Sequence, residues 1–229
     1  MPGLSVPRAA PAVPVEIRPV PTPRGEARAH LSRPAGAARG LLVLGHGAGG
    51  GVGAPDLVAI RDAAVPAGFA VALVEQPYRV AGRRAPPPAG TLDEAWTAVV
   101  HQLSTDLRGL PADPAGGDPA SWLLIVGGRS SGARVACRTA AAVGAAGVVA
   151  LAFPVRPPQR PHLDRLAELA LPAVPVLVVQ GDRDPFGVPP RARGRSVTLI
   201  PGADHSLRRD PAAVSTAVLR WLRQRQRQG

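Results

Sequence analysis

Short apolar runs with little polar alternation constrain the fold of this 229-residue chain more than any other feature of its sequence. A strand with one face in water alternates apolar and polar side chains, whereas a strand buried on both faces does not. We expect such strands at residues 40–47, 69–78, 121–128, 146–154, 174–182 and 195–204. Strands of this kind are typical of a mainly parallel sheet with helices on both faces.

Segments with helical character separate these runs, as a parallel sheet requires. They cover residues 55–68, 91–110, 132–144, 162–170 and 210–226. Thr91, with Glu94 three positions later, has the pattern of a capping box, and Asp210 is expected to cap the last helix.

The N-terminal part differs from the rest of the chain. Residues 1–12 are rich in proline and alanine and are expected to form a disordered or extended arm. Residues 15–34 suggest a hairpin around Gly25, with prolines confining its first segment to the sheet edge. The sequence therefore predicts one doubly wound α/β domain over residues 13–226.

The net charge of +11 does not by itself indicate a nucleic-acid-binding protein. All 27 basic residues are arginine, and heavy use of Ala, Gly, Pro and Val points to the coding bias of a GC-rich genome. The arginines are largely scattered, and aromatic residues amount to only 3%, whereas nucleic-acid binders combine a basic stripe with stacking aromatics. We expect weak attraction to polyanions and no specific nucleic-acid function.

Three further features bear on location. The single cysteine, Cys137, excludes an internal disulfide and fits a reducing compartment. No window holds the roughly 18 apolar residues that a membrane helix requires. The N-terminus has no continuous apolar segment typical of a secretory signal. We therefore expect a cytoplasmic protein with no membrane association.

Residues 128–132 read Gly-Arg-Ser-Ser-Gly and match the pattern G-x-S-x-G, with Ser130 in the centre. They lie between an expected strand and an expected helix, where a sharp turn exposes the central hydroxyl near the N–H groups of the helix. Phosphate binding fits poorly, because the chain has no P-loop motif and no lysine. A dinucleotide site also fits poorly, and only Glu75 keeps that alternative open.

A nucleophilic serine needs a base, and the base needs an orienting acid. His205 follows the last expected strand, and we favour it over the other four histidines as the base. Asp184 is our first choice for the acid, ahead of Asp182, with Glu75 a distant third. The order Ser, Asp, His along the chain is that of the α/β-hydrolase triad.

Glycines after the first long strand, in the sequence LGHGAGGG, can direct N–H groups toward the serine. We expect an oxyanion hole made by the N–H of Ser131 with that of Ala48 or Gly47. His46 is interpreted as a structural residue of this loop, and Arg129 as a residue that packs or pairs with a loop.

The motifs HGAGG, GRSSGARVA, QGDRDPFG and GADHSL together resemble the α/β-hydrolase superfamily over residues 13–226. The resemblance is to a branch related to dienelactone hydrolases. Within it, the chain is similar to the hydrolase-like domain of a testis-expressed protein and of a regulatory subunit of the NSL histone-acetyltransferase complex. The resemblance implies a serine-hydrolase fold with Ser130, Asp184 and His205 as the triad.

We accordingly expect hydrolysis of an ester, thioester or similar carbonyl compound without a metal or organic cofactor. The segment between the expected strands at 146–154 and 174–182 has room for only a short helix and not for a large lid, so the site is expected to be open. Arg79, Arg83 and Arg84 could steer an anionic substrate, although a solvated arginine loop explains them equally well. The alternative function is a catalytically idle hydrolase fold that acts as an interaction module.

Overall fold

An eight-stranded sheet runs through the computed structural model, which describes residues 12–108 and 122–228. The strand order is β1-β2-β4-β3-β5-β6-β7-β8. Strand β2 pairs antiparallel with β1 and β4, and all other neighbours are parallel. The strands are β1 (Glu16–Val20), β2 (Ala27–Ser32), β3 (Gly40–Gly45), β4 (Ala70–Glu75), β5 (Leu123–Arg129), β6 (Gly147–Leu151), β7 (Val176–Gly181) and β8 (Arg195–Ile200).

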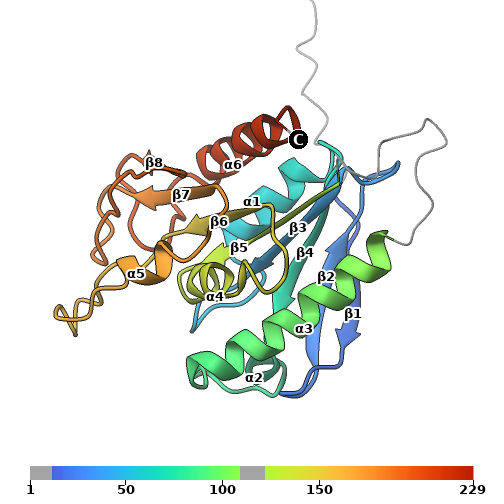
Figure 1. The fold of residues 1–229 in the computed structure, drawn as a ribbon, viewed down its shortest axis with the longest axis horizontal. Coiled ribbons are helices and arrows are strands. Elements are labelled where there is room, and N and C mark those ends of the chain that lie inside the picture. Colours follow the sequence, from blue (N-terminus) through green and yellow to red (C-terminus); the bar gives the residue numbers. More distant parts are fainter. Residues whose placement is uncertain (1–11, 109–121, 229) are drawn as a thin grey trace, which may run out of the picture.

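Helices cover both faces of the sheet (Figure 1). They are α1 (Pro55–Ala64), α2 (Pro77–Val80), α3 (Ala89–Arg108), α4 (Ser131–Thr139), α5 (Leu166–Leu169) and α6 (Pro211–Gln226). Two separate apolar clusters form the core: α1 and α6 contribute to one, and α3 and α4 to the other. The central strands are buried on both faces, which is why they lack polar alternation. The predicted fold class is confirmed.

The start of α3 differs from the prediction. This helix begins at Ala89, and the carbonyl of Pro88 accepts hydrogen bonds from the N–H groups of Thr91 and Leu92. Thr91 therefore lies inside the first turn, and its assignment as the helix cap was wrong. A proline fixes φ near its helical value and so favours an earlier start. Glu94 forms a two-pronged ion pair with Arg24 in place of the expected capping box.

Other boundaries also moved. The strand expected at 69–78 ends at Glu75, and Pro77 starts the short helix α2. The helix expected at 162–170 is reduced to the four residues of α5. The Asp164 carboxylate accepts the N–H of Leu166, which forms a local turn, and Pro161 lies directly before the expected helix. Asp210 caps α6 as expected, accepting the N–H of Ala213. The arm predicted for residues 1–12 lies, except for Ala12, outside the described residues, as do residues 109–121.

Helix α4 packs on one face of the sheet, against β5 and β6, and carries two features used below. Cys137 is buried on it, and burial raises the pKa of this thiol to about 12. On its outer side, Arg134 and Arg138 pair with Glu168 of α5, and Arg138 also pairs with Asp93 of α3. Among the described helices, none is long and apolar enough to cross a membrane.

Candidate active site

Ser130 lies at the sharp turn between β5 and α4, with φ 52° and ψ −106°. This conformation is strained for any residue with a side chain and is tolerated where the surroundings enforce it. The turn passes so close to β3 that a Cβ on Gly128 or on Gly132 would lie 2.5 Å from the carbonyl oxygen of Gly45. Both positions therefore require glycine, which explains the G-x-S-x-G spacing physically.

The imidazole of His205 lies between a hydroxyl and a carboxylate. Its Nε2 is 2.9 Å from Ser130 Oγ, and its Nδ1 is 2.9 Å from Asp184 Oδ2. The ring of Phe186 stacks on the imidazole at a centroid distance of 4.1 Å. If Nδ1 carries the proton and donates it to Asp184, Nε2 is free to accept the proton of the serine hydroxyl.

The Asp184 side chain is fully buried and accepts three hydrogen bonds. Besides His205, the donors are the Phe186 N–H to Oδ1 at 2.8 Å and the Gln180 Nε2 to Oδ2 at 2.7 Å. The loops that carry Asp184 and His205 also pack tightly. A Cβ on Gly181, before the first loop, would collide with the Ala203 carbonyl in the second. This buried carboxylate is thus fully satisfied, as a buried charge must be.

Gln180 is a site residue that the sequence analysis missed. It is completely buried at the end of β7, and its amide also pairs with both backbone groups of Phe153 after β6. A glutamine inside an apolar strand run is an unusual choice, and that anomaly is the signal that could have revealed it. By holding the loop after β6 and Asp184 together, Gln180 fixes where this carboxylate lies.

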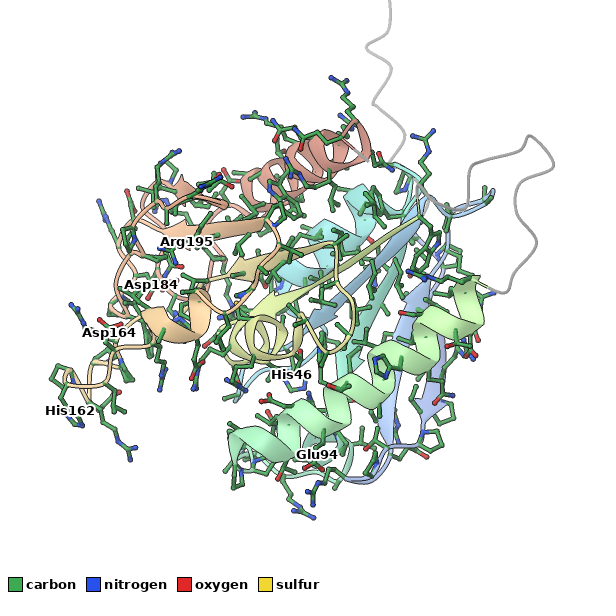
Figure 2. All side chains as sticks on the ribbon, viewed as in Figure 1. His46, Glu94, His162, Asp164, Asp184 and Arg195 are labelled. Atoms are coloured by element: carbon green, nitrogen blue, oxygen red, sulfur yellow. The ribbon has the colours of Figure 1, made fainter. Side chains whose placement is uncertain are left out.

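The other candidates for acid and base lie elsewhere. Asp182 is exposed, and Glu75 lies 3.8 Å from His30 at the boundary between β4 and β2. Figure 2 shows Asp184 beyond β7 and His162 on the outer tip of the segment before α5. His101 is exposed on α3. The structure thus brings together Ser130, Asp184 and His205, and none of the alternatives.

His46 is buried and fixes the loop after β3. Its Nε2 accepts the N–H of Gln76 at 3.2 Å, so Nδ1 carries the proton and donates to the Gly47 carbonyl at 2.8 Å. Burial lowers the pKa of His46, which keeps the ring neutral. Because the C=O and N–H of a trans peptide point in opposite directions, this bond turns the Ala48 N–H away from His46.

The same loop contacts the serine turn. A Cβ on Gly47 would lie 3.8 Å from Ser130 Cβ, and the Ala48 carbonyl is held by the hydroxyl of Tyr78 at 2.7 Å. Ser131 is the first residue of α4, so no carbonyl of the helix accepts a hydrogen bond from its N–H. Of the three residues expected to form an oxyanion hole, Gly47 and Ser131 therefore border Ser130, and Ala48 follows Gly47 in the same loop.

A family model described as "Alpha/beta hydrolase domain" matches residues 38–221. The chain belongs to this alpha/beta hydrolase family. Three solved structures illustrate the likeness. An alpha-beta serine hydrolase homologue from Coxiella burnetii shares 17% identity with a TM-score of 0.69, covering 90% of this chain and 97% of that one.

The second is a serine hydrolase without lid from Xanthomonas campestris, with 20% identity and a TM-score of 0.65, covering 93% and 98% of the two chains. The third is a dienelactone hydrolase from Anabaena variabilis, with 18% identity and a TM-score of 0.66 over the same shares. At such identities the likeness shows the fold alone. No curated protein matches the chain significantly. The narrower resemblance to the testis-expressed and NSL-complex proteins is supported by none of these matches and stays a prediction.

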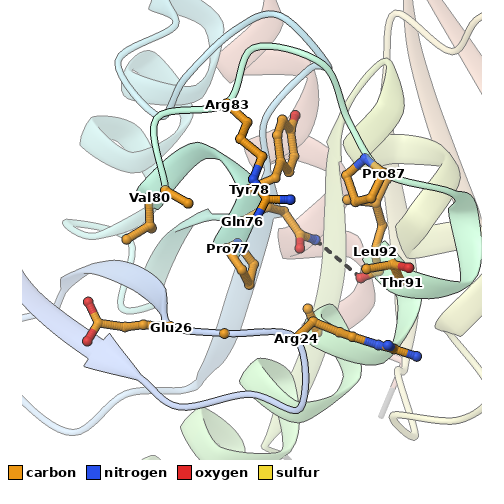
Figure 3. A pocket seen from close by; sticks show the side chains of 13 residues that line it. Arg24, Glu26, Gln76, Pro77, Tyr78, Val80, Arg83, Pro87, Thr91 and Leu92 are labelled. Carbon is orange, nitrogen blue, oxygen red and sulfur yellow. Dashed lines mark hydrogen bonds between the residues drawn. The ribbon is translucent and has the colours of Figure 1, made fainter.

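The protein has a cavity of about 280 Å³ at the carboxyl edge of the sheet, between the β1–β2 turn, the end of β4 and the start of α3 (Figure 3). Arg83 and Tyr78 line it together with Gln76. Of the three arginines expected to meet substrate, only Arg83 borders this cavity. Arg84 is exposed, and Arg79 donates through Nη1 to the carbonyl of Arg83 at 3.3 Å.

Within residues 12–108 and 122–228, no group of three His, Cys, Asp or Glu side chains is arranged to hold a metal ion.

Proposed function

We propose that this hydrolase cleaves esters, thioesters or similar acyl compounds through an acyl-enzyme formed on Ser130. One observation carries the proposal: the His205 imidazole lies 2.9 Å from both the Ser130 hydroxyl and the Asp184 carboxylate. A strained serine against a positioned imidazole and a buried carboxylate is the arrangement that makes a hydroxyl nucleophilic.

In the proposed reaction, Ser130 Oγ attacks the carbonyl carbon while its proton passes to His205 Nε2. Asp184 holds the resulting imidazolium through Nδ1–H. The N–H groups of Ser131 and of Ala48 or Gly47 stabilise the negative charge on the carbonyl oxygen, and the orientation set by His46 favours Ala48. The intermediate then expels the alcohol or thiol, which takes the proton from His205.

Water completes the cycle. His205 accepts a proton from a water molecule as its oxygen attacks the acyl carbon, and the serine leaves with that proton. The solved structures of a serine hydrolase without lid and of a dienelactone hydrolase support this class of chemistry through their shared fold. No step of this proposed reaction uses a metal or an organic cofactor.

Labelling with a fluorophosphonate probe tests the proposal directly, because such probes react with activated serines. We expect the wild type to be labelled and Ser130→Ala to be unlabelled, while Ser131→Ala keeps labelling. The adjacent serine is a matched control, since it shares the turn but not the contact with His205. Absence of labelling in the wild type would support the idle interaction module instead.

We further propose that Arg83 steers substrates whose acyl or leaving group carries a negative charge. It lines the same cavity as Tyr78, the residue that holds the Ala48 carbonyl. None of Ser130, Asp184 and His205 lines this cavity, and Tyr78 is the residue that connects it to the loop expected to stabilise the oxyanion.

Arg83→Gln should raise the KM for 4-nitrophenyl hemisuccinate by about two- to fivefold and leave the KM for 4-nitrophenyl butyrate unchanged, because an exposed charge contributes up to about 1 kcal/mol. Arg84→Gln is the matched control, since Arg84 is also exposed but lies outside the cavity lining. Steady-state kinetics with both esters provide the measurement. An equal change for the neutral ester would disprove the steering role.

A further inference from the structure

Arg129 reaches away from its own turn to the loop that carries His205. It occupies the variable position directly before Ser130, and its side chain is only 15% exposed. Its Nη2 donates to the backbone carbonyl of His205 at 3.2 Å. The residue next to the proposed nucleophile thus holds the main chain of the proposed base, while the imidazole of that base faces the nucleophile itself.

A buried carboxylate faces the other side of this guanidinium. Asp56, in the first turn of α1, is completely buried, and its Oδ2 lies 3.5 Å from Arg129 Nε. Within the described residues, Arg129 is the one ion-pair partner of Asp56, and neither carboxylate oxygen has a side-chain hydrogen bond. Burial raises the pKa of Asp56, while the charges of Arg129 and Arg208 act in the opposite direction.

We propose that Arg129 and Asp56 are positioning residues for the hydrolytic reaction: Asp56 orients the guanidinium, and the guanidinium holds His205 against Ser130. The inference rests on the proposed function, because it assigns these residues a role in that same site. Neither side chain is required to touch the substrate.

Fold stability alone is a poor explanation for this pair. Taking two charges out of water is costly, and a single contact of 3.5 Å without good hydrogen-bond geometry recovers little of that cost. The planar guanidinium, however, joins the first turn of α1, the turn at Ser130 and the loop of His205 with fixed geometry. A small displacement of a catalytic group can cost up to about a hundredfold in rate, so a rigid link there has a direct effect on catalysis.

The first test is Arg129→Lys, which keeps the charge but loses the fork. We expect kcat for 4-nitrophenyl butyrate and the rate of fluorophosphonate labelling to fall by about ten- to a hundredfold, with KM changed by less than twofold. The matched control is Arg138→Lys, which breaks a two-pronged ion pair on α4 away from the site. It should lower the melting temperature and leave kcat near the wild-type value.

Asp56→Asn provides a second variant in case the lysine variant folds poorly. It leaves the bond from Arg129 to His205 possible but removes the group that orients the guanidinium, so kcat should again fall with KM unchanged. The double variant should be no slower than Arg129→Lys alone, because both changes break one chain of contacts.

A loss of melting temperature in Arg129→Lys with kcat and labelling preserved would overturn the inference and leave a purely structural ion pair. If the loss of kcat in the double variant equalled the two single losses combined, Arg129 and Asp56 would act independently, and their linked role would be overturned. The proposed function fails by a different result, namely wild-type protein that is not labelled or a Ser130→Ala variant that still is.

Discussion

Asp184 receives its three hydrogen bonds from three different parts of the chain, and together they fix the orientation of its carboxylate. The donors come from the end of β7, from its own turn and from the loop before α6. Asp182, two residues away, is exposed. The sequence motif QGDRDPFG cannot distinguish the two, whereas burial and geometry can.

Asp184→Asn should lower kcat by about 10⁴-fold, because an amide in this place favours the wrong tautomer of the base. Asp182→Asn should stay within about twofold of the wild type, since its side chain faces solvent. Esterase rates of the two variants, measured beside their melting temperatures, distinguish the two roles. Equal losses in both variants would contradict the assignment of the acid.

Residues that follow a recognisable pattern were accessible from the sequence, and residues that act through contacts were not. Ser130 lies in a spacing dictated by close backbone packing, and His205 follows a strand end in the expected order. The roles of Gln180, the first residue of the motif QGDRDPFG, and of Asp56 depend on which segments meet in space, so the sequence pattern does not reveal them. Arg129 was expected to pair with a loop, but its partners could not be derived from its position in the chain.

Helix α4 is tied to its neighbours by charges on its outer side. Arg134 forms two hydrogen bonds with Glu168 of α5, at 2.6 and 2.7 Å, and Arg138 does the same with Asp93 of α3, at 2.7 and 2.8 Å. This network joins α4 to α3 and α5. Burial would raise the pKa of Glu168, but the bonds and charges of Arg134 and Arg138 outweigh it and lower that pKa.

Glu168→Gln should destabilise the protein at neutral pH by about 1.5 kcal/mol, the lower end of the contribution of a hydrogen bond to a charged group, because the side chain is partly exposed. A lowered pKa in the folded state adds stability above the ordinary glutamate range, and this stability is lost as the pH falls through the folded value. The difference between variant and wild type should therefore shrink below about pH 4. Denaturant unfolding at several pH values measures it.

Glu26→Gln is the control, because Glu26 is exposed and its nearest cation, Arg28, is 3.6 Å away. It should change stability little at any pH. A difference for Glu168→Gln that persists at low pH would contradict the assigned cause.

At the level of elements, the strands were predictable because burial on both faces leaves a clear apolar signature. Helix boundaries were harder, since local turns compete with helix propensity. Pro88 moved the start of α3 ahead of Thr91, and Pro77 started α2 where a strand had been expected. These shifts arise from the fixed φ of proline, and they left the strand-end position of Ser130 unchanged.

The charge of the whole molecule should act on polyanions without selecting among them. With a net charge of +11, carried by scattered arginines, association with DNA is expected to be electrostatic. Fluorescence anisotropy should show equal binding to two unrelated DNA duplexes and at least about a tenfold loss of affinity between 50 and 200 mM salt. A preference for one duplex, or binding that resists salt, would contradict this expectation.

The burial of Cys137 under the site has a practical consequence. A thiol with a pKa of about 12 and no access to solvent does not react with maleimides or iodoacetamide in the folded protein. Since the sequence contains one cysteine, a second one introduced on the surface would be the only position to accept a dye. The motions of individual loops around Ser130 can therefore be followed by fluorescence without first removing a native thiol.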